Sequence, residues 1–261
     1  MTAEAATEGL SAADASPWMA RVRGNVELYI TPLFFLILAA AAGAVWIYAD
    51  MDFQTADILE PSKLLTQIRQ HLIVTVWSTV VVLIVAIPLG IFLTRPRFRK
   101  LAGGFLGLAN SGQAIPAYGL LVLFAAWLGT EVSTAVVALT VFSLLPVLRN
   151  TMVGIDQVDK AVIEAGRGMG LSKWQALTQI ELPLAVPVIL AGVRIALVIN
   201  VGTAALVFLI GAGGLGETIN SGLKLRRDVA VFIGGALVAM LALIIDYAAA
   251  WIERWLRPKG V

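Results

Sequence analysis

The sequence predicts an all-α, polytopic transmembrane helical bundle of about six spans. Of the 261 residues, 59% are hydrophobic and 14% are charged, whereas soluble globular proteins average roughly half apolar and a quarter charged. The mean hydropathy is +0.88. Six runs are long enough for a helix to cross the hydrocarbon core, which takes about 20 mostly apolar residues. Lipid must therefore be part of the solvent of this chain.

The six apolar runs follow one another with short polar breaks between them. They span residues 30–48, 72–93, 105–128, 133–153, 184–210 and 229–252. Asn110, Ser111 and Gln113 interrupt the third run, which is therefore the weakest of the six. Pro116 follows these polar residues, so we expect the helix to unwind there and to expose backbone groups to a pathway.

The distribution of lysine and arginine predicts the orientation. Thirteen of the 19 basic residues fall in loops on one side of the membrane and five on the other, while Arg194 lies inside the fifth run. Cytoplasmic loops carry the excess of Lys and Arg. We therefore expect a multi-pass protein of the bacterial plasma (inner) membrane with both termini in the cytoplasm.

This topology divides the chain into four parts. Residues 1–25 are expected to form a disordered cytoplasmic tail, because they are polar and lack the basic-then-apolar order of a signal peptide. Residues 26–71 hold an extra N-terminal span and an outward loop. Residues 72–252 form the core, with a cytoplasmic segment at 156–183, and residues 253–261 form a second cytoplasmic tail.

The composition argues against several classes of function. The chain has no cysteine and one histidine, His71, so we expect no metal, no cofactor and no embedded enzyme site. His71 is expected at the membrane interface. No G-x-x-x-x-G-K-[ST] phosphate loop is present. Residues 211–216 satisfy G-x-G-x-x-G, but a membrane-length apolar run precedes them, so we expect close backbone packing there. The basic residues form no nucleic-acid-binding face.

The longest cytoplasmic interruption, residues 156–183, predicts two short helices. Asp156 or Asp159 is expected to cap the first helix, which runs to about Arg167. Glycines at 166, 168 and 170 then bend the chain, because glycine readily takes positive φ.

The second helix of this segment has its own start signal. Ser172 and Gln175 form a capping-box pattern. We expect the helix to end near Leu182 and Pro183 to open the next membrane helix at its first turn.

The same segment resembles the EAA loop of binding-protein-dependent ABC importer permeases. That pattern is E-A-A, three residues, G, nine residues, I, one residue and L-P, and this chain departs from it only at Gly166, which replaces the second alanine. The matching residues are Glu164, Ala165, Gly170, Ile180, Leu182 and Pro183. The resemblance implies an ABC importer type I (methionine-importer-like) permease core.

The resemblance also implies a mechanism and partners. In that family the loop is a coupling helix seated in a groove of the ATPase subunit. The residues that the likeness assigns to ATPase coupling are Glu164, Ala165, Gly166, Gly170, Leu171, Ser172, Ile180, Leu182 and Pro183. The implied partners are an ABC ATPase subunit, a second permease subunit (identical or paralogous), an extracytoplasmic substrate-binding protein and membrane lipid. ATP hydrolysis is expected in the ATPase and not in this chain.

Three further stretches resemble permeases of osmoprotectant importers for glycine betaine, choline or carnitine. They are S-G-Q-A-I-P at Ser111–Pro116, R-I-A-L-V-I-N-V-G-T-A at Arg194–Ala204 and G-A-G-G-L-G-E-T-I at Gly211–Ile219. That family usually has Q-T-I-P at the first stretch, and Ala114 departs from it. The methionine-importer type of permease shares part of this likeness, so an amino-acid importer is the alternative.

Polar residues inside the apolar runs are candidates for lining the pathway. They are Asn110, Gln113, Pro116 and Asn200. Such groups are costly in lipid unless they are paired or face a cavity, and hydrogen bonding between helices is the alternative use. For Arg194 and Asp246 we expect such pairing. An ion-coupled secondary transporter is a further alternative, but no internal repeat supports it.

Overall fold

The computed structural model describes residues 17–256, with side chains from residue 30 onward. Over this range the chain forms helices and no strand, as predicted. The long helices are α1 (Pro17–Tyr48), α3 (Pro61–Thr94), α6 (Val132–Asp156), α9 (Leu182–Ala204) and α11 (Asp228–Leu256). The shorter elements are α2 (Phe53–Ile58), η2 (Arg99–Leu101), α4 (Ala102–Ala114), α5 (Ala117–Leu128), α7 (Lys160–Gly168), α8 (Lys173–Ala176), η3 (Leu177–Glu181), η4 (Val207–Ile210) and α10 (Gly216–Leu225).

The predicted spans correspond to five long helices and one bent pair. By length and hydropathy, five helices of the described chain can cross a membrane, and α8, η3 and α9 count together as one of them. The pair formed by η2–α4 and α5 is bent by 101°. The bend confirms the expected break, since α4 ends at Ala114 and Ile115 adopts an extended backbone with φ −75° and ψ 132°. A residue before proline avoids the helical region, and Pro116 imposes this on Ile115.

Two helices begin earlier than the hydropathy predicts. Helix α3 starts at Pro61 rather than at residue 72. Proline suits the first helical position, because its missing N–H would have no partner there. Helix α1 starts at Pro17, so residues 17–25, which were predicted to be a disordered tail, are helical. Residues 1–16 of that tail and residues 257–261 of the second one lie outside the described chain.

Helices α3, α6 and α9 form the centre of the bundle and approach one another at glycines. A methyl group on Gly90 of α3 would lie 2.8 Å from the Thr151 side chain of α6. One on Gly192 of α9 would lie 2.8 Å from the Pro146 carbonyl oxygen of α6. Small residues that allow such close backbone contact are typical of helix packing in membranes.

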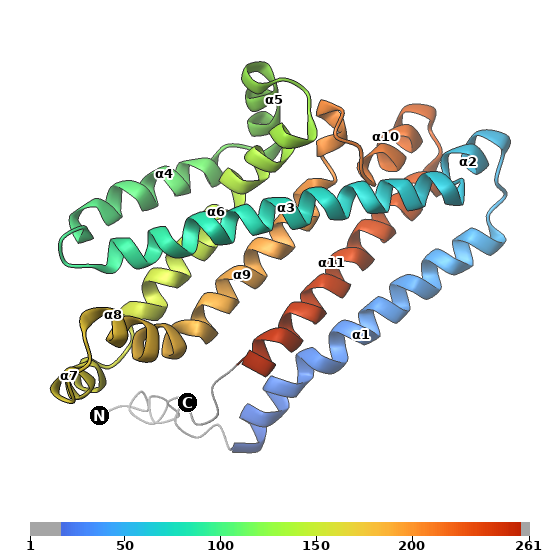
Figure 1. Ribbon diagram of the computed structural model, residues 1–261. Helices are drawn as coiled ribbons and strands as arrows, with labels where there is room; N and C mark the ends of the chain where they lie inside the picture. Colours follow the sequence, from blue (N-terminus) through green and yellow to red (C-terminus); the bar gives the residue numbers. More distant parts are fainter. Residues whose placement is uncertain (1–16, 257–261) are drawn as a thin grey trace, which may run out of the picture.

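The first helix lies at the edge of the bundle beside α11 (Figure 1). Its buried Ala42 packs in a cluster with Ile233 and Ala236 of α11. Helix α2 lies at the same end of the bundle as α10. An ion pair joins them: Nη2 of Arg227, between α10 and α11, lies 2.8 Å from a carboxylate oxygen of Asp52, which precedes α2. Thr55 donates a side-chain hydrogen bond to the same carboxylate, which lowers the pKa of Asp52 below its usual value.

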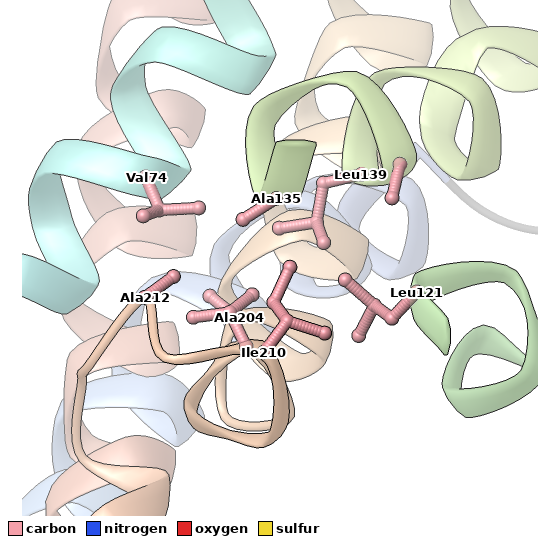
Figure 2. Packing of buried hydrophobic residues seen from close by; sticks show 9 residues of the cluster. Val74, Leu121, Ala135, Leu139, Ala204, Ile210 and Ala212 are labelled. Carbon is pink, nitrogen blue, oxygen red and sulfur yellow. The ribbon is translucent and has the colours of Figure 1, made fainter. Parts of the chain in front are cut away.

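The two ends of the bundle carry different elements. Helices α7 and α8 lie at one end, whereas α2, α5 and α10 lie at the other (Figure 1). Near the α5 end, side chains of α3, α5 and α6 converge on Ile210 and Ala212 in one apolar cluster (Figure 2). This cluster anchors residues 211–216, here called the glycine turn. Residues 160–183, with α7 and α8, are called the EAA segment.

Candidate functional site

The first helix of the EAA segment is capped by Asp159. The Asp159 carboxylate accepts a hydrogen bond of 2.8 Å from the Ala161 backbone N–H. Of the two predicted caps, Asp156 instead ends α6 and lies 3.2 Å from an Arg99 guanidinium nitrogen. Helix α7 runs to Gly168, one residue beyond the prediction.

A single glycine turns the chain between the two short helices. Gly170 has φ +98°. Its N–H donates to the Arg167 carbonyl, and the Leu171 N–H donates to the Gly166 carbonyl, at 3.0 and 3.2 Å. This pair of bonds is the Schellman motif that ends many helices. Gly168 was also expected to bend the chain, but it belongs to α7.

Gly166 serves packing rather than bending. It is buried within α7, and a methyl group on it would overlap the Ile180 side chain. The residue at which this chain departs from the E-A-A pattern therefore lies where α7 meets η3. A glycine there lets the two elements come closer than an alanine would allow.

The second helix begins as predicted and does not end where predicted. The Ser172 hydroxyl accepts from the Gln175 N–H at 3.2 Å, and the Gln175 side chain accepts from the Ser172 N–H at 2.8 Å, which completes the capping box. Helix α9 begins at Leu182 with Pro183 in its first turn, as predicted, but the chain does not leave the helix there. Helix α8 continues through η3, one turn of π-helix, into α9.

Proline at position 183 explains why the turn is widened. The Leu182 N–H donates to the Leu177 carbonyl, five residues back. In an α-helix the ring of Pro183 would clash with the carbonyl four residues before it. A π-turn displaces that carbonyl, so the helix passes Pro183 unbroken. The second half of the EAA segment, α8 and η3, therefore forms one helix with α9, a predicted membrane span.

The outer face of the EAA segment exposes apolar side chains together with a carboxylate. Met169 is 81% exposed and Trp174 70% exposed. Glu164 and Ala165 are exposed beside them, and so are Gly170, Ser172 and Pro183. Leu171, Ile180 and Leu182 are partly buried. Large apolar side chains gathered at the tip of a protein are typical of a surface that docks on a partner.

A partly buried ion pair lies on the inner face of this segment. Arg95, which follows α3, contacts Glu181 of η3 through both carboxylate oxygens, at 2.6 and 3.3 Å. The Glu181 side chain is 9% exposed. Between the two elements lies a cleft of about 500 Å³, whose lining also includes Arg167, Lys173 and Trp174.

The predicted pathway residues divide into two groups. Asn110 and Pro116 are exposed and Gln113 is partly buried, at the break between α4 and α5. Asn200 is fully buried, and its amide donates to the Thr79 hydroxyl of α3 at 3.0 Å. In this conformation Asn200 joins two helices. Its expected place on a pathway, like that of the other three residues, stays a prediction.

The two charged residues expected to pair inside the membrane do so. The Arg194 side chain of α9 contacts both carboxylate oxygens of Asp246 on α11, and the Nη2–Oδ2 distance is 2.8 Å. An ion pair of this kind removes most of the cost of placing either charge among apolar helices.

The glycine turn packs tightly, as predicted. A methyl group on Gly216 would overlap the Ala205 carbonyl oxygen, and one on Gly213 would overlap the Gln70 side chain. Gln70 accepts a hydrogen bond of 3.0 Å from the Gly214 N–H. No strand precedes the turn within residues 17–256.

His71 lies in the core of the bundle. It is fully buried, and its Nε2 lies 2.9 Å from the Val201 carbonyl oxygen. Helix α3 begins at Pro61, which places His71 ten residues inside the helix, and its expected depth at the membrane interface stays a prediction. Gln67, Gln70 and His71 share one helical face, and their spacing was the signal that sequence reasoning missed. Among the described residues no cluster of metal-binding side chains occurs.

Comparison with curated proteins gives a consistent set of relatives. The chain is 40% identical over 198 residues to a carnitine transport permease protein of Listeria monocytogenes, covering 76% of this chain and 88% of that one. It is 41% identical over 199 residues to a glycine betaine/carnitine/choline transport system permease protein of Bacillus subtilis, covering 76% and 91%. It is 42% identical over 193 residues to an osmoprotectant import permease protein of Salmonella typhimurium, covering 74% and 82%.

A solved structure supports the same architecture. A chain of a methionine ABC transporter in an inward-facing conformation matches with a TM-score of 0.66 and 26% identity, covering 76% of this chain and 99% of that one.

The family model for binding-protein-dependent transport system inner membrane components matches residues 86–258. The match includes the whole EAA segment, the bent pair α4–α5 and the glycine turn. The relatives and the fold agree with this match. The chain belongs to the family of binding-protein-dependent transport system inner membrane components.

Proposed function

We propose that this chain is the permease subunit of an ATP-driven importer whose solute is an osmoprotectant such as glycine betaine, choline or carnitine. The observation that carries the proposal is the EAA segment: an exposed tip that continues as one helix into a span. Three relatives at 40–42% identity are named for transport of carnitine, for glycine betaine/carnitine/choline transport and for osmoprotectant import. The three named solutes are all quaternary ammonium compounds.

The partners follow from what the chain carries and lacks. Its sequence has no phosphate-binding loop, so ATP hydrolysis belongs to a separate ATPase subunit. That ATPase receives Glu164, Ala165, Met169 and Trp174 in a groove of its surface. Since Lys and Arg dominate the loops on this side, the EAA segment and both termini face the cytoplasm, and an extracytoplasmic binding protein delivers the solute to the opposite end.

The pathway forms between this chain and a second permease subunit. The polar break between α4 and α5 supports this arrangement, because Asn110 and Pro116 are exposed on one isolated chain. Polar groups at membrane depth have to face protein or water. Transport proceeds by alternating access: ATP closes the ATPase pair, the tips move together, and α9 moves with the tip to which it is joined.

A methionine-type amino-acid importer is the second candidate. The fold match to the methionine transporter favours it, but at 26% identity it is weaker than the likeness to the osmoprotectant permeases. Proteoliposomes that contain the permease, its ATPase and its binding protein separate the two. We expect ATP-dependent uptake of labelled glycine betaine, choline or carnitine. Uptake of methionine with none of these three would replace the proposed solute class.

Glu164→Arg tests the ATPase contact. Reversal of this exposed charge should lower uptake by about tenfold, the effect of roughly 1.4 kcal/mol of lost coupling, while membrane insertion stays intact. The measurement compares solute uptake, ATP hydrolysis and the amount of inserted protein in proteoliposomes. Normal uptake by the variant would contradict the assignment.

The contact can also be detected directly. Because the chain contains no cysteine, a Ser172→Cys variant has one thiol, on the exposed rim of the EAA segment. We expect it to crosslink to a single cysteine placed in the ATPase groove. Glu131→Cys, exposed between α5 and α6 at the opposite end, is the matched control and should not crosslink.

A further inference from the structure

The EAA segment is joined to the bundle at two places, and one of them is a side-chain contact. The first is the backbone, through η3 into α9. The second is the ion pair between Arg95 and Glu181, two residues that are 86 positions apart in the sequence. Glu181 lies inside the π-turn itself, so the contact falls at the point where the EAA segment becomes a membrane span.

The environment of this pair makes it a firm connection. Two parallel N–H···O contacts join the guanidinium to the carboxylate, and such bidentate pairs are geometrically specific. The Arg95 guanidinium also donates to the Thr94 hydroxyl at 3.0 Å, which fixes it against the end of α3. Because Glu181 is nearly buried, its charge depends on Arg95 for compensation.

Little else fills the space around the pair. The cleft of about 500 Å³ lies there, lined by Arg95, Pro96 and residues of α7, α8 and η3. On the side of this cleft the ion pair joins the end of α3 to the EAA segment, while Ile91 of α3 and Leu182 pack on one apolar cluster nearby. A movement of the EAA segment can reach α3 directly by this contact.

We propose that Arg95 and Glu181 are positioning residues that transmit movement of the EAA segment to α3, in parallel with the backbone route to α9. The inference rests on the proposed function, in which an ATPase moves the EAA segment. Helix α3 lies against both α6 and α9 in the centre of the bundle. Both routes therefore converge on the three central helices, and losing one route should weaken coupling without preventing ATP hydrolysis.

A second ion pair of the same loop provides a matched control. Arg99 and Asp156 lie 3.2 Å apart, with side chains 65% and 39% exposed. Exposed pairs of this kind contribute little because water screens them. Arg99→Gln therefore makes the same chemical change as Arg95→Gln, four residues away, in a contact that the proposal does not use.

The experiment measures solute molecules taken up per ATP hydrolysed in proteoliposomes of the complete transporter. The variants are Glu181→Gln, Arg95→Gln, the double variant and Arg99→Gln. We expect the ratio to fall by about tenfold in the first three and to stay unchanged in Arg99→Gln. The double variant should be no worse than either single one, since the two residues act through one contact. The double variant also leaves no unpaired buried charge, so its uptake ratio stays informative if Arg95→Gln alone does not fold.

Several outcomes overturn the proposal. An unchanged ratio in Glu181→Gln would do so, and so would additive losses in the double variant. A purely structural role would lower the amount of folded protein, ATP hydrolysis and uptake by one factor, leaving the ratio intact. The Ser172→Cys crosslink separates the two proposals: if it forms while Glu181→Gln keeps its ratio, only the inference fails, whereas its absence removes the docking role on which both rest.

Discussion

The EAA segment and the glycine turn both concentrate glycine, at opposite ends of the bundle, and their glycines of positive φ lie in different surroundings. In the EAA segment, Gly170 reverses the chain in open space, since no atom lies within 4 Å of where its methyl group would be. In the glycine turn, Gly213 and Gly216 have no room for a methyl group at all. A motif rich in glycine can thus indicate a turn, a close approach or both, as at Gly213, and the surrounding contacts decide which.

The largest effect is expected where backbone meets backbone. Gly216→Ala would push a methyl group into the Ala205 carbonyl oxygen and within 2.6 Å of the Phe208 ring. Neither group can move aside easily, so we expect a loss of more than about 3 kcal/mol. The melting midpoint and the monodisperse yield in detergent measure it. Gly235→Ala on α11, with nothing within 4 Å, is the control and should change stability by less than about 1 kcal/mol.

A smaller effect separates two glycines that share a backbone conformation. Gly170 and Gly213 have φ of +98° and +75°, so alanine at either position costs about 1–2 kcal/mol in strain. At Gly213 the methyl group would also displace Gln70 and break its 3.0 Å hydrogen bond to the Gly214 N–H. We therefore expect Gly213→Ala to lower the melting midpoint more than Gly170→Ala. The reverse order would mean that the comparison between the two regions is wrong.

The smallest effect is local to the EAA segment. Ser172→Ala removes half of the capping box at the start of α8, at a cost of about 1 kcal/mol. Hydrogen exchange of the first α8 amides should accelerate by about fivefold, with little change in global melting. Ser133→Ala, whose hydroxyl bonds only an exposed Glu131 side chain, serves as control. Slow exchange in the Ser172 variant would show that packing alone holds α8.

Features set by neighbouring residues were predictable from the sequence. Hydropathy located the spans, Pro116 located the break between α4 and α5, and the Ser172–Gln175 spacing located the start of α8. Each depends on a few consecutive residues whose backbone preferences or side-chain reach decide the local structure. The candidate docking face came from the resemblance to the EAA loop, and its contact with an ATPase stays a prediction.

Features that depend on distant residues were not predictable. Nothing in the sequence links Arg95 to Glu181, since each is one charged residue among several in a polar loop. The burial of His71 was missed because hydropathy marks the apolar part of α3 and not its first turns. The unbroken passage through Pro183 was also missed. A proline usually ends a helix, and whether a π-turn absorbs it depends on how the adjoining elements pack.

The glycine contacts at Gly90 and Gly192 have a consequence for motion during a transport cycle. Helices that touch backbone to backbone cannot slide past one another without losing dense packing, because packed cores switch between discrete arrangements and do not deform continuously. We therefore expect α3, α6 and α9 to change between discrete arrangements during the cycle and not to slide continuously. The flexing has to occur at places without such contacts: the 101° bend after Ala114 and the peripheral helix α1, whose Gly43 has no atom within 4 Å of where its methyl group would be.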